Sequence, residues 1–184
     1  VLAYIGLLNH DRVSLISFSD GVVKEMPGRR GKNQMWRAMH FLESLKNEGQ
    51  TNLANTFRRF FGIGRTRGLV FVISDFLLEE TLEDSFRPLI QYGHDVFAGH
   101  IIASEEENPS LDGQVVLIDS ESREALSAQV TETMLATYRT EFNKYRANTE
   151  QFFKRAGWSY VPLRTDVDFE ASVLTALKKE GMFR

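Results

Sequence analysis

The sequence contains no cysteine, and it has no long uninterrupted run of apolar residues. The absence of cysteine excludes disulfides, thiolate metal sites, iron–sulfur clusters and cysteine nucleophiles. The most apolar stretch, Leu69 to Leu78, is interrupted by Asp75. No stretch therefore reaches the roughly 20 apolar residues that a membrane-spanning helix needs.

The rest of the composition is that of a soluble globular protein. The 184 residues are 42% hydrophobic and 26% charged, with a formal net charge of −3, which fits one folded domain with its own core. The charge is uneven, because the stretch from Lys24 to Arg67 holds ten basic and only three acidic side chains. Such a stretch suits nucleic acid or an acidic protein surface, but it is also typical of an ordinary solvated face.

Helical and strand patterns alternate through the first third of the chain. Apolar residues at spacings of three and four predict a helix over 32–48, whose apolar positions include Met35, Trp36, Met39 and Leu42. Pro27 and Gly28 are expected to end the strand before it. The other elements predicted here are a helix over 1–9, a strand over 12–18 with a return strand over 22–26, and a helix that is capped by Thr51 or Asn52 and runs to Phe61.

The same alternation continues to the C-terminus. Leu69–Ile73 is apolar without alternation, which predicts a central parallel strand covered on both faces. The later elements are a helix over 81–92, a strand over 96–102, a polar loop over 104–110, a hairpin over 114–118 and 123–127, a long helix over 131–156, a strand over 158–163 and a closing helix over 169–179.

Strands that alternate with helices predict a mostly parallel sheet with helices on both faces. Ligands bind such sheets beyond the carboxyl ends of the strands, where Asp75 follows the most apolar strand and Thr51 lies at a loop-to-helix junction. A carboxylate and a hydroxyl suit Mg²⁺ or Mn²⁺, although two oxygen ligands alone do not make a site. Helix capping by Thr51 and turn closure by Asp75 are the alternatives.

Two short segments resemble parts of the metal-ion-dependent adhesion site of von Willebrand factor A domains. These segments are Gly49-Gln50-Thr51-Asn52-Leu53 and Val72-Ile73-Ser74-Asp75-Phe76. The surrounding sequence is similar to a bacterial group, the domain of unknown function 58 family. The further matching segments are Leu2 to Tyr4, Asp11 to Val13, Phe18-Ser19, Thr51 to Arg59, Leu111 to Gly113, Leu117 to Asp119 and Leu163 to Asp166.

This resemblance implies a three-layer α/β/α, Rossmann-like domain with a mostly parallel sheet. Residues 1–103 would form the von Willebrand factor A-like core, and 104–184 a C-terminal hairpin, helix, strand and helix packed on the same domain. The chain opens at Val1 on a helical stretch, so we expect a truncated form that lacks the first strand and the Asp-x-Ser-x-Ser segment of the metal site. Arg123 stands where relatives often have glycine.

The resemblance also implies a function. Thr51 and Asp75 match metal-site residues, so Mg²⁺ or Mn²⁺ is expected in the complete parent protein and none in this fragment. The chain is expected to be a cytoplasmic, non-enzymatic partner of a MoxR-type AAA+ ATPase, in the assembly or maturation of other proteins. Arg58, Arg59 and Arg65 are expected to steer that partner.

Other functions compete with this one. A metal-free scaffold or adaptor and, less favoured, a nucleotide-dependent hydrolase are the alternatives. Gly62, Gly64 and Gly68 precede a strand instead of following one, which argues against a dinucleotide loop. His94 and His100 share a face by alternation, but the absence of a nearby acidic cluster with ligand spacing argues against a zinc pair. The missing first strand would leave 12–18 and 69–73 with free edges, which are expected to close the gap or pair between copies.

Overall fold

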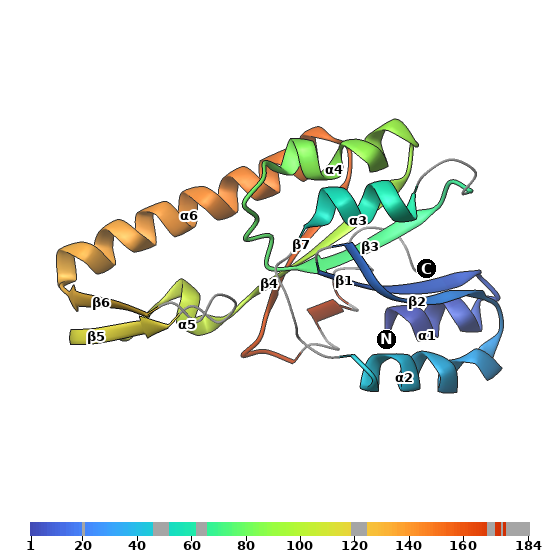
Figure 1. Ribbon diagram of the computed structural model, residues 1–184, viewed down its shortest axis with the longest axis horizontal. Coiled ribbons are helices and arrows are strands. Elements are labelled where there is room, and N and C mark those ends of the chain that lie inside the picture. Colours follow the sequence, from blue (N-terminus) through green and yellow to red (C-terminus); the bar gives the residue numbers. More distant parts are fainter. Residues whose placement is uncertain are drawn as a thin grey trace. The chain divides into compact units, whose positions relative to one another are not determined.

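The computed structural model describes residues 1–19, 21–45, 52–61, 66–118 and 125–168, together with Ser172, Val173 and Thr175. The chain forms two compact units. Unit 1 comprises Val1–Arg65 and Asp84–Pro88, and unit 2 comprises Thr66–Glu83 and Leu89–Arg184. Together they make a mixed α/β protein with one parallel sheet and two antiparallel hairpins (Figure 1).

The centre of unit 1 is an antiparallel hairpin of β1, Val13–Ser19, and β2, Gly21–Arg29. The expectation that Pro27 and Gly28 end the second strand is wrong, because β2 continues through both. The register shifts where Leu15 pairs with Met26 but Val13 pairs with Arg29, which is a bulge. Proline is tolerated at such a bulge because it has no backbone N–H to donate to the ladder.

Helices cover both faces of this hairpin (Figure 1). On one face lies α3, Leu53–Phe60, with Leu53, Phe57 and Phe60 buried as expected. Asn52 is the N-cap of α3, since its Oδ1 accepts a hydrogen bond from the Asn55 N–H at 2.8 Å. On the other face lies α1, Leu2–Leu8, next to α2, Met35–Glu43.

The helix predicted over 32–48 is shorter than expected. It consists of a 3₁₀ turn, η1, Lys32–Gln34, followed by α2, Met35–Glu43. The helix ends at Ser44. The Ser44 hydroxyl donates to the Phe41 carbonyl at 2.7 Å, and the Lys24 ammonium donates to the Ser44 carbonyl at 2.6 Å. Ala38 is the fully buried residue of α2, whereas Trp36, Met39 and Leu42 are exposed, so the apolar stripe does not mark the covered face.

The centre of unit 2 is a parallel sheet in the order β3-β4-β7. Its strands are β3, Leu69–Ser74, β4, Asp95–Ile102, and β7, Ser159–Arg164. The prediction that 69–73 forms the central strand is wrong, because the central strand is β4, which is buried along most of its length. Leu69 and Ile73 are 47% and 44% exposed, as befits an edge strand.

Two strands are expected to have free edges. Among the described residues, β3 pairs with β4 within unit 2 and β1 pairs with β2 within unit 1. Closure of the expected gap between β1 and β3 stays a prediction. Pairing between copies stays a prediction.

The remaining elements of the chain follow the expected order. The helix α4, Leu82–Gln91, carries residues of both units. The loop expected over 104–110 contains a short helix, α5, Ser104–Glu107. The strands β5, Gly113–Ile118, and β6, Ala125–Val130, form a hairpin. This hairpin lies at the start of the next helix, α6, Glu132–Arg155 (Figure 1).

The long helix α6 confirms the expectation for 131–156 within one residue at each end. Thr131 is its N-cap, with Oγ1 accepting from the Met134 N–H at 3.3 Å, and its 24 residues span about 36 Å. Its C-terminal part buries Thr149, Phe152 and Phe153. Most of the closing helix expected over 169–179 lies outside the described residues, as do Arg123 and the 119–124 turn.

Candidate functional site

The carboxyl ends of β3, β4 and β7 form one edge of the parallel sheet in unit 2. Ser74, the last residue of β3, pairs with His100, and Ile102 at the end of β4 pairs with Arg164 at the end of β7. Parallel α/β sheets place their ligand sites at this edge. The side chains that gather here are therefore the candidate functional residues.

The first group at this edge is the turn around Asp75. The Asp75 side chain is exposed, and its Oδ1 accepts a hydrogen bond from the Leu77 N–H at 3.2 Å. The Ser74 hydroxyl accepts from the Phe76 N–H at 3.1 Å. From α6, the Tyr145 hydroxyl donates to the Asp75 backbone carbonyl at 2.8 Å. Hydrogen bonds within the turn and from α6 thus fix the backbone at Asp75.

Phe76 has an unusual backbone conformation in this turn. Its φ is +55°, in the left-handed region, and its side chain is only 2% exposed. An L-residue pays roughly 1–2 kcal/mol for this conformation, and bulky residues rarely adopt it. The ring packs 5.4 Å from the imidazole of His100 and 5.2 Å from the ring of Phe153, measured between centroids. This burial offsets the backbone strain.

His100 is the second buried group below the edge. It is 2% exposed, and its Nδ1 lies 2.7 Å from the Tyr160 hydroxyl. Burial lowers the pKa of His100 from 6.5 to about 4, partly opposed by the Asp75 carboxylate and a hydrogen bond with its backbone. Burial also raises the pKa of Tyr145 to about 12 and raises that of Tyr160. Near neutral pH the imidazole is therefore neutral, and its Nδ1 shares a hydrogen bond with the Tyr160 hydroxyl.

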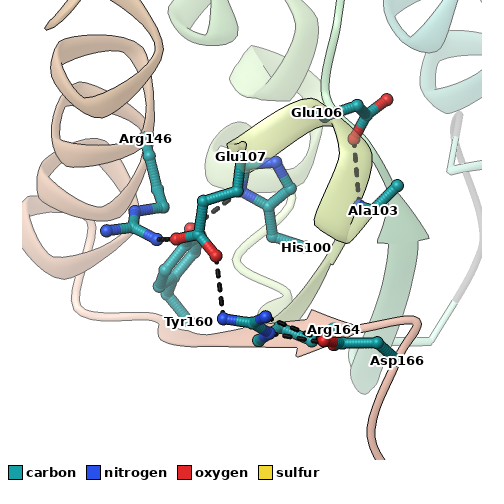
Figure 2. Close-up of polar contacts among 8 residues, drawn as sticks. All are labelled: His100, Ala103, Glu106, Glu107, Arg146, Tyr160, Arg164 and Asp166. Carbon is teal, nitrogen blue, oxygen red and sulfur yellow. Dashed lines mark hydrogen bonds and ion pairs between the residues drawn. The ribbon is translucent and has the colours of Figure 1, made fainter. Parts of the chain in front are cut away.

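An ion-pair network at this edge joins α5, which follows β4, to α6 and β7 (Figure 2). The Glu107 carboxylate, 18% exposed, receives Arg146 at 2.6 Å on one oxygen and Arg164 at 2.8 Å on the other. Arg164 also pairs with Asp166, through Nε at 2.9 Å and Nη2 at 2.8 Å. The hydrogen bond from Arg164 lowers the pKa of Asp166. The segment after β4 is thereby tied to α6 and to β7.

The two residues predicted to bind metal have different outcomes. Asp75 lies at the expected edge, while Thr51 lies outside the described residues, and the cap of α3 is its neighbour Asn52. Within the described ranges, no three histidine, aspartate or glutamate side chains are grouped closely enough to hold a metal ion. Mg²⁺ takes about six oxygens. With one Asp75 oxygen bonded to Leu77, the described side chains alone do not fit a divalent ion.

His94 and His100 do not form a zinc pair, in line with the argument against one. His94 precedes β4 and accepts from the Gly68 N–H through Nδ1 at 3.2 Å, whereas His100 lies near the other end of the strand. Six residues of strand rise by about 20 Å, so the two rings cannot share one ion.

The ion-pair network was not predicted as a site. The sequence predicts a polar loop at Glu107 and a long helix at Arg146. The available signal was the acidic run Glu105 to Glu107 directly after a buried strand, at the edge where ligands bind. The arginines of the steering hypothesis lie elsewhere: Arg58 and Arg59 are exposed on α3 in unit 1, and Arg65 is outside the described residues.

None of the described helices is both long enough and apolar enough to cross a bilayer. A search of curated proteins finds no significant match. Residues 1–151 match the family described as "Protein of unknown function DUF58".

Two solved structures resemble the fold. The conserved hypothetical protein BatB from Bacteroides thetaiotaomicron has a TM-score of 0.52 and 15% identity, over 97% of this chain and 82% of that one. An aerotolerance-related membrane protein from Bacteroides fragilis NCTC 9343, with multiple mutations to serines, has a TM-score of 0.50 and 15% identity, over 92% and 78% of the two chains. At this identity the likeness concerns the fold alone.

Proposed function

The chain belongs to the DUF58 family, and from this membership we propose that it is a non-enzymatic protein-interaction domain with a three-layer, von Willebrand factor A-like fold. The parallel β3-β4-β7 sheet and the helices that accompany it support this fold. The proposed recognition site is the carboxyl edge of that sheet, with Asp75 as the residue that meets the partner.

The observation that carries the proposal is the contrast between Asp75 and its charged neighbours. Glu107, Arg146, Arg164 and Asp166 are paired with one another, so their charges are largely satisfied within the protein. Asp75 is exposed and makes no ion pair among the described residues, and one of its oxygens points to no described donor. A fixed carboxylate of this kind is suited to accept a basic side chain or another donor from a partner.

The chemistry around Asp75 supports binding over catalysis. The candidate base His100 is buried, has a pKa of about 4, and has its Nδ1 hydrogen-bonded with the Tyr160 hydroxyl. A general base needs a pKa closer to the operating pH and access to the substrate proton. The nucleotide-dependent hydrolase is accordingly the less favoured alternative, and a nucleotide-induced rise in melting temperature would support it.

The proposed partner is a MoxR-type AAA+ ATPase in the cytoplasm, acting with this chain in the assembly or maturation of other proteins. This part of the proposal rests on the family resemblance. The exposed side chains of Arg58 and Arg59 offer positive charge for steering an acidic surface.

Mg²⁺ or Mn²⁺ at a metal-ion-dependent adhesion site belongs to the proposal only for a protein that also carries the Asp-x-Ser-x-Ser segment. For the present chain, the metal-free scaffold is the form that the described donors favour, because they do not fit a divalent ion.

Affinity capture of the purified ATPase on the immobilised chain, with and without a chelator, tests the proposal. We expect capture that the chelator leaves unchanged. Capture that disappears with the chelator would favour a metal-dependent site, and no capture under either condition would contradict the proposed partner.

A further inference from the structure

Tyr145 donates a hydrogen bond to the backbone at Asp75 from outside the turn. Its hydroxyl reaches the Asp75 carbonyl at 2.8 Å from a position 70 residues later, in α6. The ring is half-buried and packs edge-on against His100, with centroids 5.8 Å apart. The ring of Tyr145 is therefore fixed by packing below the turn, while its hydroxyl forms a hydrogen bond with the backbone of the turn.

His100 supports the same turn from β4. Its ring packs against Phe76, the residue with the left-handed backbone, and is fixed by the Tyr160 hydroxyl from β7 at 2.7 Å. Side chains from α6 and β4 thus contact two consecutive residues of the turn, and β7 supports the one from β4. A strained conformation of a non-glycine residue persists only where its surroundings determine it, and such residues concentrate at functional sites.

We propose that Tyr145 and His100 are positioning residues, whose side chains hold the backbone of the Asp75 turn so that the Asp75 carboxylate is presented at the sheet edge in one orientation. The assignment of Asp75 as the recognition group rests on the proposed function, whereas the holding of the turn follows from the contacts alone. Without the Tyr145 hydroxyl, the Asp75 carbonyl loses one of its hydrogen-bond donors, and Phe76 is less constrained to its left-handed backbone conformation.

Amide hydrogen exchange of the full chain, measured by NMR for Tyr145→Phe, tests the holding of the turn. The substitution removes one hydroxyl and keeps the ring. We expect the Phe76 amide to exchange about two- to tenfold faster, the effect of losing one net hydrogen bond. Tyr160→Phe, which frees the His100 ring, is expected to change Phe76 in the same direction.

The matched control is Tyr138→Phe, which removes a hydroxyl from α6 about two turns earlier. That hydroxyl makes no hydrogen bond to a described residue, and its ring stacks on Phe142. We expect unchanged exchange at Phe76 in this variant. Unchanged exchange in Tyr145→Phe, or equal acceleration in Tyr138→Phe, would overturn the positioning role.

Capture of the ATPase by the same variants separates this inference from the proposed function. Faster Phe76 exchange together with weaker capture supports both. Faster Phe76 exchange in Tyr145→Phe upholds the positioning role. If both Tyr145→Phe and Asp75→Ala still capture the ATPase fully, Asp75 is not the recognition group.

Discussion

At the scale of single residues, the buried imidazole of His100 has the clearest consequence for stability. Its ring is surrounded by Phe76, Tyr145 and Tyr160, so that the charged form is poorly solvated. Burial lowers its pKa to about 4, while the carboxylate of Asp75 partly opposes and the cation of Arg146 adds to this shift. The ring contributes to the fold as a neutral imidazole that is hydrogen-bonded with the Tyr160 hydroxyl.

The folded state is therefore expected to lose stability as the pH falls below about 6.5. The unfolded chain takes up a proton on this histidine near pH 6.5, and the folded chain only near pH 4. Between these values the unfolded state binds more protons, which lowers the free energy of unfolding by up to about 1.4 kcal/mol per pH unit.

Urea unfolding of the wild type and of His100→Gln at several pH values between 7 and 4.5 checks this prediction. The difference between the two proteins removes the common contribution of the carboxylates. We expect the wild type to lose stability more steeply than His100→Gln in this window. Parallel pH profiles would show that His100 is not responsible.

At the scale of elements, the local sequence predicts those whose signals are local. Thr131 and Gly157 flank α6, and the long helix begins and ends where capping and spacing indicate. The apolar run Leu69–Ile73 wrongly predicts a central strand, because an unbroken apolar stretch indicates hydrophobicity and not the number of neighbouring strands. The ion pairs of Glu107 join residues 39 and 57 positions apart, and single-sequence periodicity has no access to such contacts.

The N-cap of α6 provides a prediction at this scale. Thr131→Ala removes the side-chain acceptor for the Met134 N–H, which is expected to cost about 1 kcal/mol of stability. The control is Thr137→Ala within the same helix, where Oγ1 only donates back to the Thr133 carbonyl. This control should be neutral or slightly stabilising, since alanine favours helix. Thermal unfolding of both variants measures the difference, and equal effects would contradict the capping role.

At the scale of the whole molecule, a mixed α/β fold with a parallel sheet is predictable and the order of its strands is not. Alternating strands and helices indicate a parallel sheet, and unit 2 contains one, β3-β4-β7. The candidate site is predictable at Asp75, because the carboxyl edge follows from the fold class. Its neighbours Tyr145, Glu107 and Arg164 come from distant segments, and only tertiary structure reveals them.

The exposed edge of β3 predicts association between copies of the chain. An edge strand with an apolar surface recruits other strands, and Ile73 is 44% exposed on it. Light scattering coupled to size-exclusion chromatography should show a species larger than the monomer at high concentration. Ile73→Lys is expected to shift the population toward monomer, because a charge on an edge strand opposes pairing. A wild-type chain that stays monomeric at all concentrations would contradict this.

The central claim, that this chain recognises a protein through Asp75, is tested most directly by the dissociation constant for the MoxR-type ATPase. The comparison is between Asp75→Ala and Asp95→Ala. Asp95 is an exposed aspartate at the opposite end of the same sheet, where β4 begins. We predict that Asp75→Ala weakens binding at least about tenfold, as expected for loss of a charge-assisted hydrogen bond at an interface, while Asp95→Ala leaves it unchanged. Equal affinities for the two variants would contradict the claim.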